Sequence, residues 1–196
     1  MEENNELSSS MTPEPDGEGQ QPPSVQELLE QFVQTQQWDT AVESIDDGSG
    51  FRVEETILVH NQYYVIRLEG DESRNLFRLR IRPPYRVMEG KFVDACMLCN
   101  FINERYRYYG RLSVSEETGV INYRDFVEYG SSAPSMEILR NMADCGVIFF
   151  DEYQKVIAEV ALTRKTYESI VREMSEEEEN RNREDEQSEE SDNLLS

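Results

Sequence analysis

The sequence has few of the residues on which most enzymatic and metal chemistry depends. It contains one histidine, His60, and three cysteines among 196 residues. One histidine offers a single base for Ser–His–Asp or Cys–His catalysis, and GxSxG, GxxxxGK[ST] and GxGxxG motifs are missing. An odd number of cysteines argues against a disulfide framework and fits a reducing cytoplasm. The composition therefore predicts a cytoplasmic protein that is not an enzyme.

Long apolar runs are also missing. No stretch approaches the roughly 20 apolar residues that a membrane-spanning helix needs. Residues 1–5 have neither the basic nor the apolar region of a signal peptide. The formal net charge of −22 opposes binding to nucleic acid or to an anionic membrane, because both are negative themselves. We therefore expect protein or peptide partners, no nucleic acid or membrane, and no metal or other cofactor.

The negative charge is concentrated at the two ends of the chain. Residues 1–23 contain six acidic and no basic residues, and residues 175–196 contain ten acidic residues and two arginines. Both segments have too few apolar residues to offset the entropy of ordering by burial, so we predict two disordered acidic tails. Residues 24–174 are then a single domain, long enough to bury a hydrophobic core.

Three segments have the apolar spacing of helices. The first, residues 24–38, opens with the capping box formed by Ser24 and Glu27. The second covers residues 91–109. The third starts at Pro134 and continues for nearly 40 residues. That length leaves three readings open, namely a bend at Gly146, a break at residues 163–164, or contact with a partner.

Five strand-like segments lie between these helices, and the second and third alternate apolar and polar residues. They cover residues 51–60, 63–69, 76–82, 111–115 and 120–129. The last two are joined by a short link in which Gly119 suits a positive φ. The order α-βββ-α-ββ-α predicts an α+β fold, with a five-stranded, mainly antiparallel sheet and helices on one face.

The few residues with possible chemistry favour structural roles. Cys96 and Cys99 form a CxxC inside the apolar stripe of the second helix, so we interpret them as core residues rather than as a redox or zinc pair. His60 lies at a turn and reads as a surface residue. Residues 46–50 lack the ligand spacing of a calcium loop and read as a turn. No catalytic residue and no metal site are predicted.

Arginines on the strands are the charged feature that stands out. Arg67, Arg78, Arg80 and Arg82 fall on the polar faces of two neighbouring strands in an otherwise acidic protein. One interpretation is cross-strand pairing with Glu54, Glu69 or Glu128. The other is a docking surface for an acidic segment, either of a partner or of the carboxy-terminal tail of the protein. These four arginines are the candidate protein-binding residues.

Four short segments resemble the YbjN family, which is described as bacterial sensory transduction regulators. They are Asn100-Phe-Ile-Asn103, Gly110-Arg-Leu-Ser-Val, Thr118-Gly-Val-Ile-Asn-Tyr-Arg124 and Ser135-Met-Glu-Ile-Leu139. The family has the fold of type III secretion chaperones, and the element order from Ser24 to about Tyr167 is similar to it. The long last helix and the acidic tails depart from the pattern.

The resemblance implies a small homodimer without enzymatic activity that binds proteins or peptides, and it transfers no active-site residue. The first hypothesis is a cytosolic regulator or adaptor in sensory transduction or stress. The second is a specific secretion chaperone that holds one effector segment in an extended form. The third is an unrecognised enzyme, against which the single histidine and the missing motifs argue.

Overall fold

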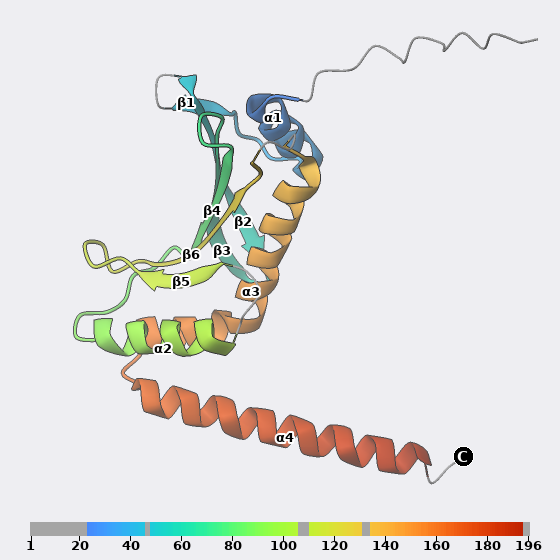
Figure 1. The fold of residues 1–196 in the computed structure, drawn as a ribbon. Helices are drawn as coiled ribbons and strands as arrows, with labels where there is room; N and C mark the ends of the chain where they lie inside the picture. The colour runs from blue at the N-terminus through green and yellow to red at the C-terminus, as the bar shows by residue number, and fades with distance from the viewer. Residues whose placement is uncertain (1–22, 46–47, 106–109, 131–133, 194–196) are drawn as a thin grey trace, which may run out of the picture.

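The computed structural model describes residues 23–45, 48–105, 110–130 and 134–193, with side chains up to residue 184 (Figure 1). At its centre is a six-stranded sheet with the strand order β1-β2-β3-β4-β6-β5, in which every neighbouring pair is antiparallel. The strands are β1 (Glu43–Ile45), β2 (Gly50–Val59), β3 (Gln62–Asp71), β4 (Leu76–Arg82), β5 (Arg111–Val114) and β6 (Ile121–Glu128).

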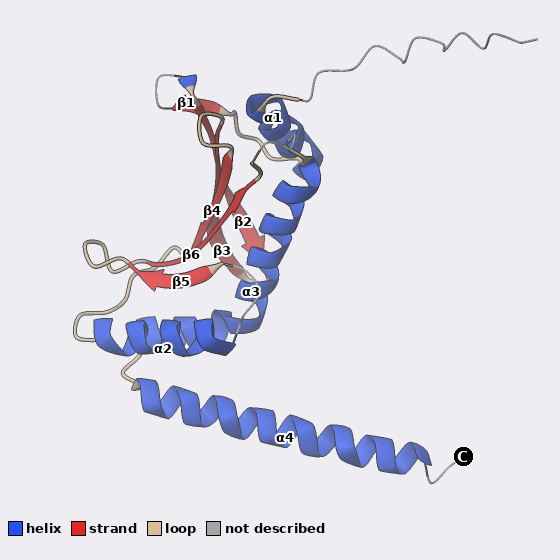
Figure 2. Ribbon diagram, viewed as in Figure 1, coloured by secondary structure: helices blue, strands red, loops and turns tan. Residues whose placement is uncertain are grey.

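Helices α1 (Val25–Gln36) and α3 (Met136–Leu162) lie against one face of this sheet (Figure 2). Helix α2 (Phe92–Arg105) packs against β5, and α4 (Tyr167–Asn193) packs against α2 and α3. The opposite face, which we call the outer face, has none of the described helices over it (Figure 2). Within the described residues, no helix combines the length and the apolar character needed to cross a bilayer.

Strand alternation places the core between the sheet and helices α1 and α3. Tyr64, Ile66 and Leu68 of β3 point inward and are fully buried. Helix α3 approaches the sheet closely at Gly146, where a Cβ atom would lie 2.5 Å from the Cδ1 atom of Ile81. Gly146 is therefore a point of close packing inside the continuous helix α3.

Several local predictions are confirmed. Ser24 and Glu27 form the expected capping box at the start of α1. The link between β5 and β6 has Gly119 at φ +66°. The helical pattern that starts at Pro134 is broken at residues 163–164, as one of the three readings had it. Helix α3 ends at the cap residue Thr163, and α4 starts at Tyr167.

Other predictions need correction. The sheet has six strands and not five, because β1 lies in residues for which no strand was predicted, and the chain order is α-ββββ-α-ββ-α-α. Residues 175–193 continue α4, although a disordered tail was predicted there. Glutamate and arginine have high helix propensity, and extending a helix that is already packed is favourable. The tail predicted over residues 1–23 lies almost wholly outside the described residues.

Candidate functional site: the outer face of the sheet

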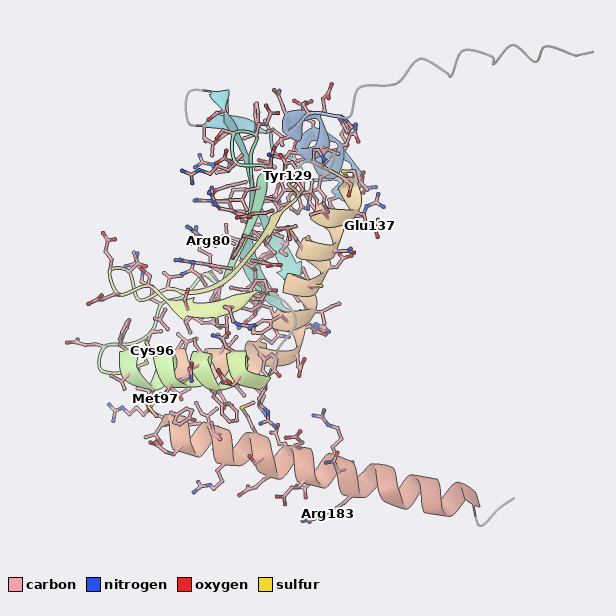
Figure 3. All side chains as sticks on the ribbon, viewed as in Figure 1. Arg80, Cys96, Met97, Tyr129, Glu137 and Arg183 are labelled. Carbon is pink, nitrogen blue, oxygen red and sulfur yellow. The ribbon has the colours of Figure 1, made fainter. Side chains whose placement is uncertain are left out.

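Four arginines lie directly opposite one another on four adjacent strands. In the strand register, Arg67 of β3 pairs with Arg80 of β4, Arg80 pairs with Arg124 of β6, and Arg124 pairs with Arg111 of β5. We call this row the arginine ladder. Directly opposed residues of antiparallel strands share a face, and these lie on the outer face, where Figure 3 shows Arg80 on the side away from α1 and α3.

The neighbouring row of the sheet has a different charge pattern. Arg52 of β2 is opposite Glu69 of β3, and Glu69 is opposite Arg78 of β4. Opposite charges therefore alternate along this row, as expected for a stabilising polar face. Phe126 of β6 follows Arg78 in the register. In the ladder, only Arg67 is next to an acidic residue in the strand register, and the other members are opposite arginines alone. The excess positive charge is therefore concentrated in one line across the sheet.

Acidic partners compensate the β2 side of this face. Arg67 contacts the Oε2 atom of Glu54 through Nε at 2.6 Å and through Nη2 at 2.5 Å, and its Nη1 lies 3.8 Å from Glu69. Arg78 lies 3.9 Å from the Oδ2 atom of Asp71, at the outer limit of an ion pair. Of the predicted ion pairs with Glu54, Glu69 or Glu128, the described residues show only those of Arg67 with Glu54 and Glu69.

The charge toward β6 is not neutralised in this way. Among the described residues, Arg80, Arg82 and Arg124 form no side-chain hydrogen bond and no ion pair within 4.0 Å. Burial lowers the pKa of Arg80 below its usual value, and the positive charges of Arg124 and Arg67 lower it further. Arg80 thus holds a partly desolvated positive charge between two like charges, which is the environment that an anion would stabilise.

A cavity of about 210 Å³ opens beside the ladder. Its lining includes Arg80, Arg124, Asp125 and Phe126, and the Phe126 side chain is 67% exposed. Burial raises the pKa of the Asp125 carboxyl, while the backbone N–H of Phe126 donates a hydrogen bond to it at 2.8 Å. The site therefore places guanidinium donors beside an exposed aromatic ring, a combination that can hold both a carboxylate and an apolar side chain.

Sequence reasoning found part of this surface. The candidates Arg67 and Arg80 belong to the ladder, and Arg78 and Arg82 lie on the same outer face of β4. Reasoning from sequence did not include Arg111 and Arg124. They are separated from β4 by a helix, and their places depend on the pairing of β4 with β6. The alternation within residues 120–129 was the only available signal.

The other candidates considered from the sequence do not form a site among the described residues. Cys99 is 4% exposed, and burial raises its thiol pKa to about 12; Cys96 is half-buried, with its pKa raised for the same reason. His60 lies at an exposed turn with its Nδ1 atom 2.5 Å from Asp151. No group of three or more potential ligands in the described part of the chain is arranged to hold a metal.

Fold and site together define an α+β protein with an open, basic sheet face. No family model matches the chain, and no curated protein matches it. Among solved structures, a chain of the crystal structure of the ExsC–ExsE complex is 16% identical, with 65% of this chain and 91% of that chain covered and a TM-score of 0.45. A chain of the HopA1–SchA chaperone–effector complex is 14% identical, with 64% and 88% covered and a TM-score of 0.39. Likenesses at this level assign no function, and the resemblance to the YbjN family stays a prediction.

Proposed function

We propose that this protein is a non-enzymatic binding module that captures an acidic segment of a partner protein on the outer face of its sheet. The observation that carries the proposal is the arginine ladder, in which Arg80 and Arg124 face each other without acidic partners among the described residues. A role as a cytoplasmic, homodimeric regulator or adaptor belongs to the same proposal.

The chemistry of the ladder favours carboxylates. Guanidinium groups bind them through two parallel N–H bonds, and such charge-assisted bonds contribute about 1.5–3 kcal/mol each. The partial burial of Arg80 strengthens the attraction, because fewer water molecules compete for the charge. An aromatic anchor at Phe126 then supplies apolar contact beside the charge. An acidic peptide with at least one apolar side chain matches this surface best.

A second candidate function is the capture of an extended segment, as a secretion chaperone does. The observation in its favour is a second exposed apolar pair on the same outer face, Leu58 of β2 opposite Tyr63 of β3. Each side chain is 60% exposed. A long segment lying across the sheet would contact both this pair and the ladder. Replacing Leu58 with Asp would then weaken the binding of long peptides and leave the binding of short ones unaffected.

Fluorescence anisotropy tests the first proposal with a short labelled peptide that is rich in glutamate and contains one leucine. We expect the double variant Arg80→Glu/Arg124→Glu to weaken binding by at least about tenfold, since two charge-assisted contacts become repulsive. The matched control is Arg140→Glu/Arg164→Glu, which changes the net charge equally at two exposed positions outside the sheet, one in α3 and one just after it.

Binding should also weaken as salt is raised, because part of the attraction is screened. Equal losses in the ladder variant and in the control would mean that the peptide senses only the overall charge. A wild-type protein that fails to bind below about 1 mM would equally contradict the proposal.

A further inference from the structure

Among the described side chains, those that attach helix α4 to the domain lie in its first half. Ile170 is buried, and Val171 and Met174 are half-buried against the core. Among the described residues, the last ion pairs with other helices join Lys155 to Glu177 and Arg105 to Glu178. From Glu179 to residue 184 the side chains are exposed, and the ion pair of this segment joins Arg183 to Glu179 within α4 itself.

The free half of α4 ends in a strongly acidic segment, residues 184–193, which we call the acidic end. Its ten residues contain no basic residue and six acidic ones: Glu184, Asp185, Glu186, Glu189, Glu190 and Asp192. Two like-charge pairs have i, i+4 spacing, which destabilises an isolated helix. Acidic groups also interact unfavourably with the carboxy-terminal pole of a helix. A basic surface against this segment would remove both penalties.

The acidic end lies far from the arginine ladder of its own chain. Figure 1 shows α4 leaving the domain beyond α2 and ending well away from the sheet. In Figure 3 the outer face with Arg80 is on one side of the molecule, and α4 passes Arg183 toward the other side. The contact between tail and arginines considered from the sequence therefore has no geometric basis within one molecule. A second copy, in contrast, can bring the two surfaces together.

We propose that the acidic end of one chain binds the arginine ladder of a second copy. The inference rests on the proposed function, because it takes the outer face as a site for acidic segments and names one occupant. Three steps between four strands span about 14 Å, and ten helical residues span about 15 Å, so the two surfaces match in length. The six acidic residues give the acidic end a charge opposite to that of a surface on which Arg80, Arg82 and Arg124 have no acidic partner among the described residues.

Such a contact is heterologous, since different surfaces of the two copies meet. Two copies that exchange their acidic ends reciprocally form the smallest closed assembly. Occupation by a second copy would also compete with an acidic partner, so the free protein would regulate access to its own binding face. The partner would have to displace the acidic end.

Sedimentation equilibrium on full-length variants near 0.15 M salt tests the contact by charge reversal. The ladder variant is Arg80→Glu/Arg124→Glu, and the helix variant is Glu186→Lys/Glu189→Lys/Glu190→Lys. We expect wild-type chains to associate and each variant alone to associate at least about tenfold more weakly. An equimolar mixture of the two variants should recover the association as a 1:1 complex, because each reversed surface then meets its opposite.

Three results would overturn the inference: a wild-type monomer at all concentrations, a ladder variant that associates like wild type, or a mixture that shows no recovery. The glutamate-rich peptide probe separates these failures from failure of the proposed function. If the peptide binds the ladder of a chain that does not self-associate, the proposed function stands, and only the inference that a second copy occupies the ladder is refuted. If wild-type protein neither binds the peptide nor self-associates, the proposed function and the inference about a second copy are both refuted.

Discussion

Replacing Arg80 with glutamine should stabilise the protein, although it removes a partly buried side chain from the centre of the sheet. Arg80 lies directly opposite Arg67 on one side and Arg124 on the other. Like charges at directly opposed positions of antiparallel strands are destabilising. Glutamine keeps a polar side chain of similar reach and removes the charge from both contacts at once.

The expected gain is small but measurable. Opposed strand pairs contribute roughly 0.2–1 kcal/mol each, so relief of two repulsions gives about 0.4–2 kcal/mol. Loss of the attraction between Arg80 and Glu69, together with part of the buried aliphatic stem, reduces this gain. The net increase in the free energy of unfolding is then about 1 kcal/mol at most, which corresponds to a rise in Tm of up to about 4 °C for a chain of this length.

Urea denaturation followed by tryptophan fluorescence measures the effect through Trp38, which packs edge-on against Phe32. Arg67→Gln is the matched control on the same face. It relieves one repulsion but breaks the ion pair with Glu54, so we expect no gain or a loss. In about 1 M salt the Debye length falls to about 3 Å, and the advantage of Arg80→Gln should shrink.

A double-mutant cycle between Arg80 and Arg124 decides the cause. If repulsion is responsible, Arg80→Gln/Arg124→Gln gains less than the sum of the single variants, because each replacement already relieves their shared contact. A destabilisation by Arg80→Gln at an unchanged denaturant slope, or a cycle with no coupling, would refute this account of the ladder.

Three further predictions concern the supports of the fold. Asp94→Ala removes the acceptor of the Tyr167 N–H, 2.7 Å away at the start of α4, and should lower the free energy of unfolding by about 2–3 kcal/mol in a denaturation experiment. The pKa of Asp94 is lowered in the folded state. Its contribution to stability should therefore be present at neutral pH and disappear as acid protonates the carboxylate. Burial raises the pKa of Asp125 in the folded state, so its carboxylate opposes folding at neutral pH. Asp125→Asn should therefore raise the unfolding midpoint at about pH 7. The difference between variant and wild type should vanish below about pH 3.9, the usual pKa of an aspartate in an unfolded chain. Gly110→Ala would place a Cβ atom 2.3 Å from the carbonyl oxygen of Arg124 and should lower Tm.

Local features of the fold were readable because they depend on neighbouring residues. The capping box at Ser24 and the positive φ of Gly119 follow from side-chain chemistry within a few positions of the chain. Alternation along β4 likewise placed Arg78, Arg80 and Arg82 on one face. Strand β1 was missed because three residues, Glu43 to Ile45, are too few to show alternation, and only pairing with β2 makes them a strand.

The ladder itself was beyond reach of the sequence for a different reason. Its central contact joins β4 to β6, which are separated in the chain by α2 and β5. A shift of one residue in that register would place Arg124 on the core side and leave Arg80 facing a different residue. The sequence contains each arginine, but their direct opposition arises only from the long-range register of the sheet.

The like charges of the ladder lower the stability of the free protein and also attract an acidic ligand. Stability and binding are therefore linked, and the link can be tested. An acidic peptide present at about 100 times its Kd stabilises the state that binds it by about 2.7 kcal/mol. That exceeds the gain of about 1 kcal/mol at most by which we expect Arg80→Gln to stabilise the free protein. Because the variant has lost a central guanidinium, it gains less from the peptide. The order of stability should therefore reverse, with Arg80→Gln melting above wild type alone and below it in saturating peptide. Equal stabilisation of both proteins by the glutamate-rich probe would show that the peptide binds elsewhere, and that the positive charge of Arg80 and Arg124 serves no acidic ligand.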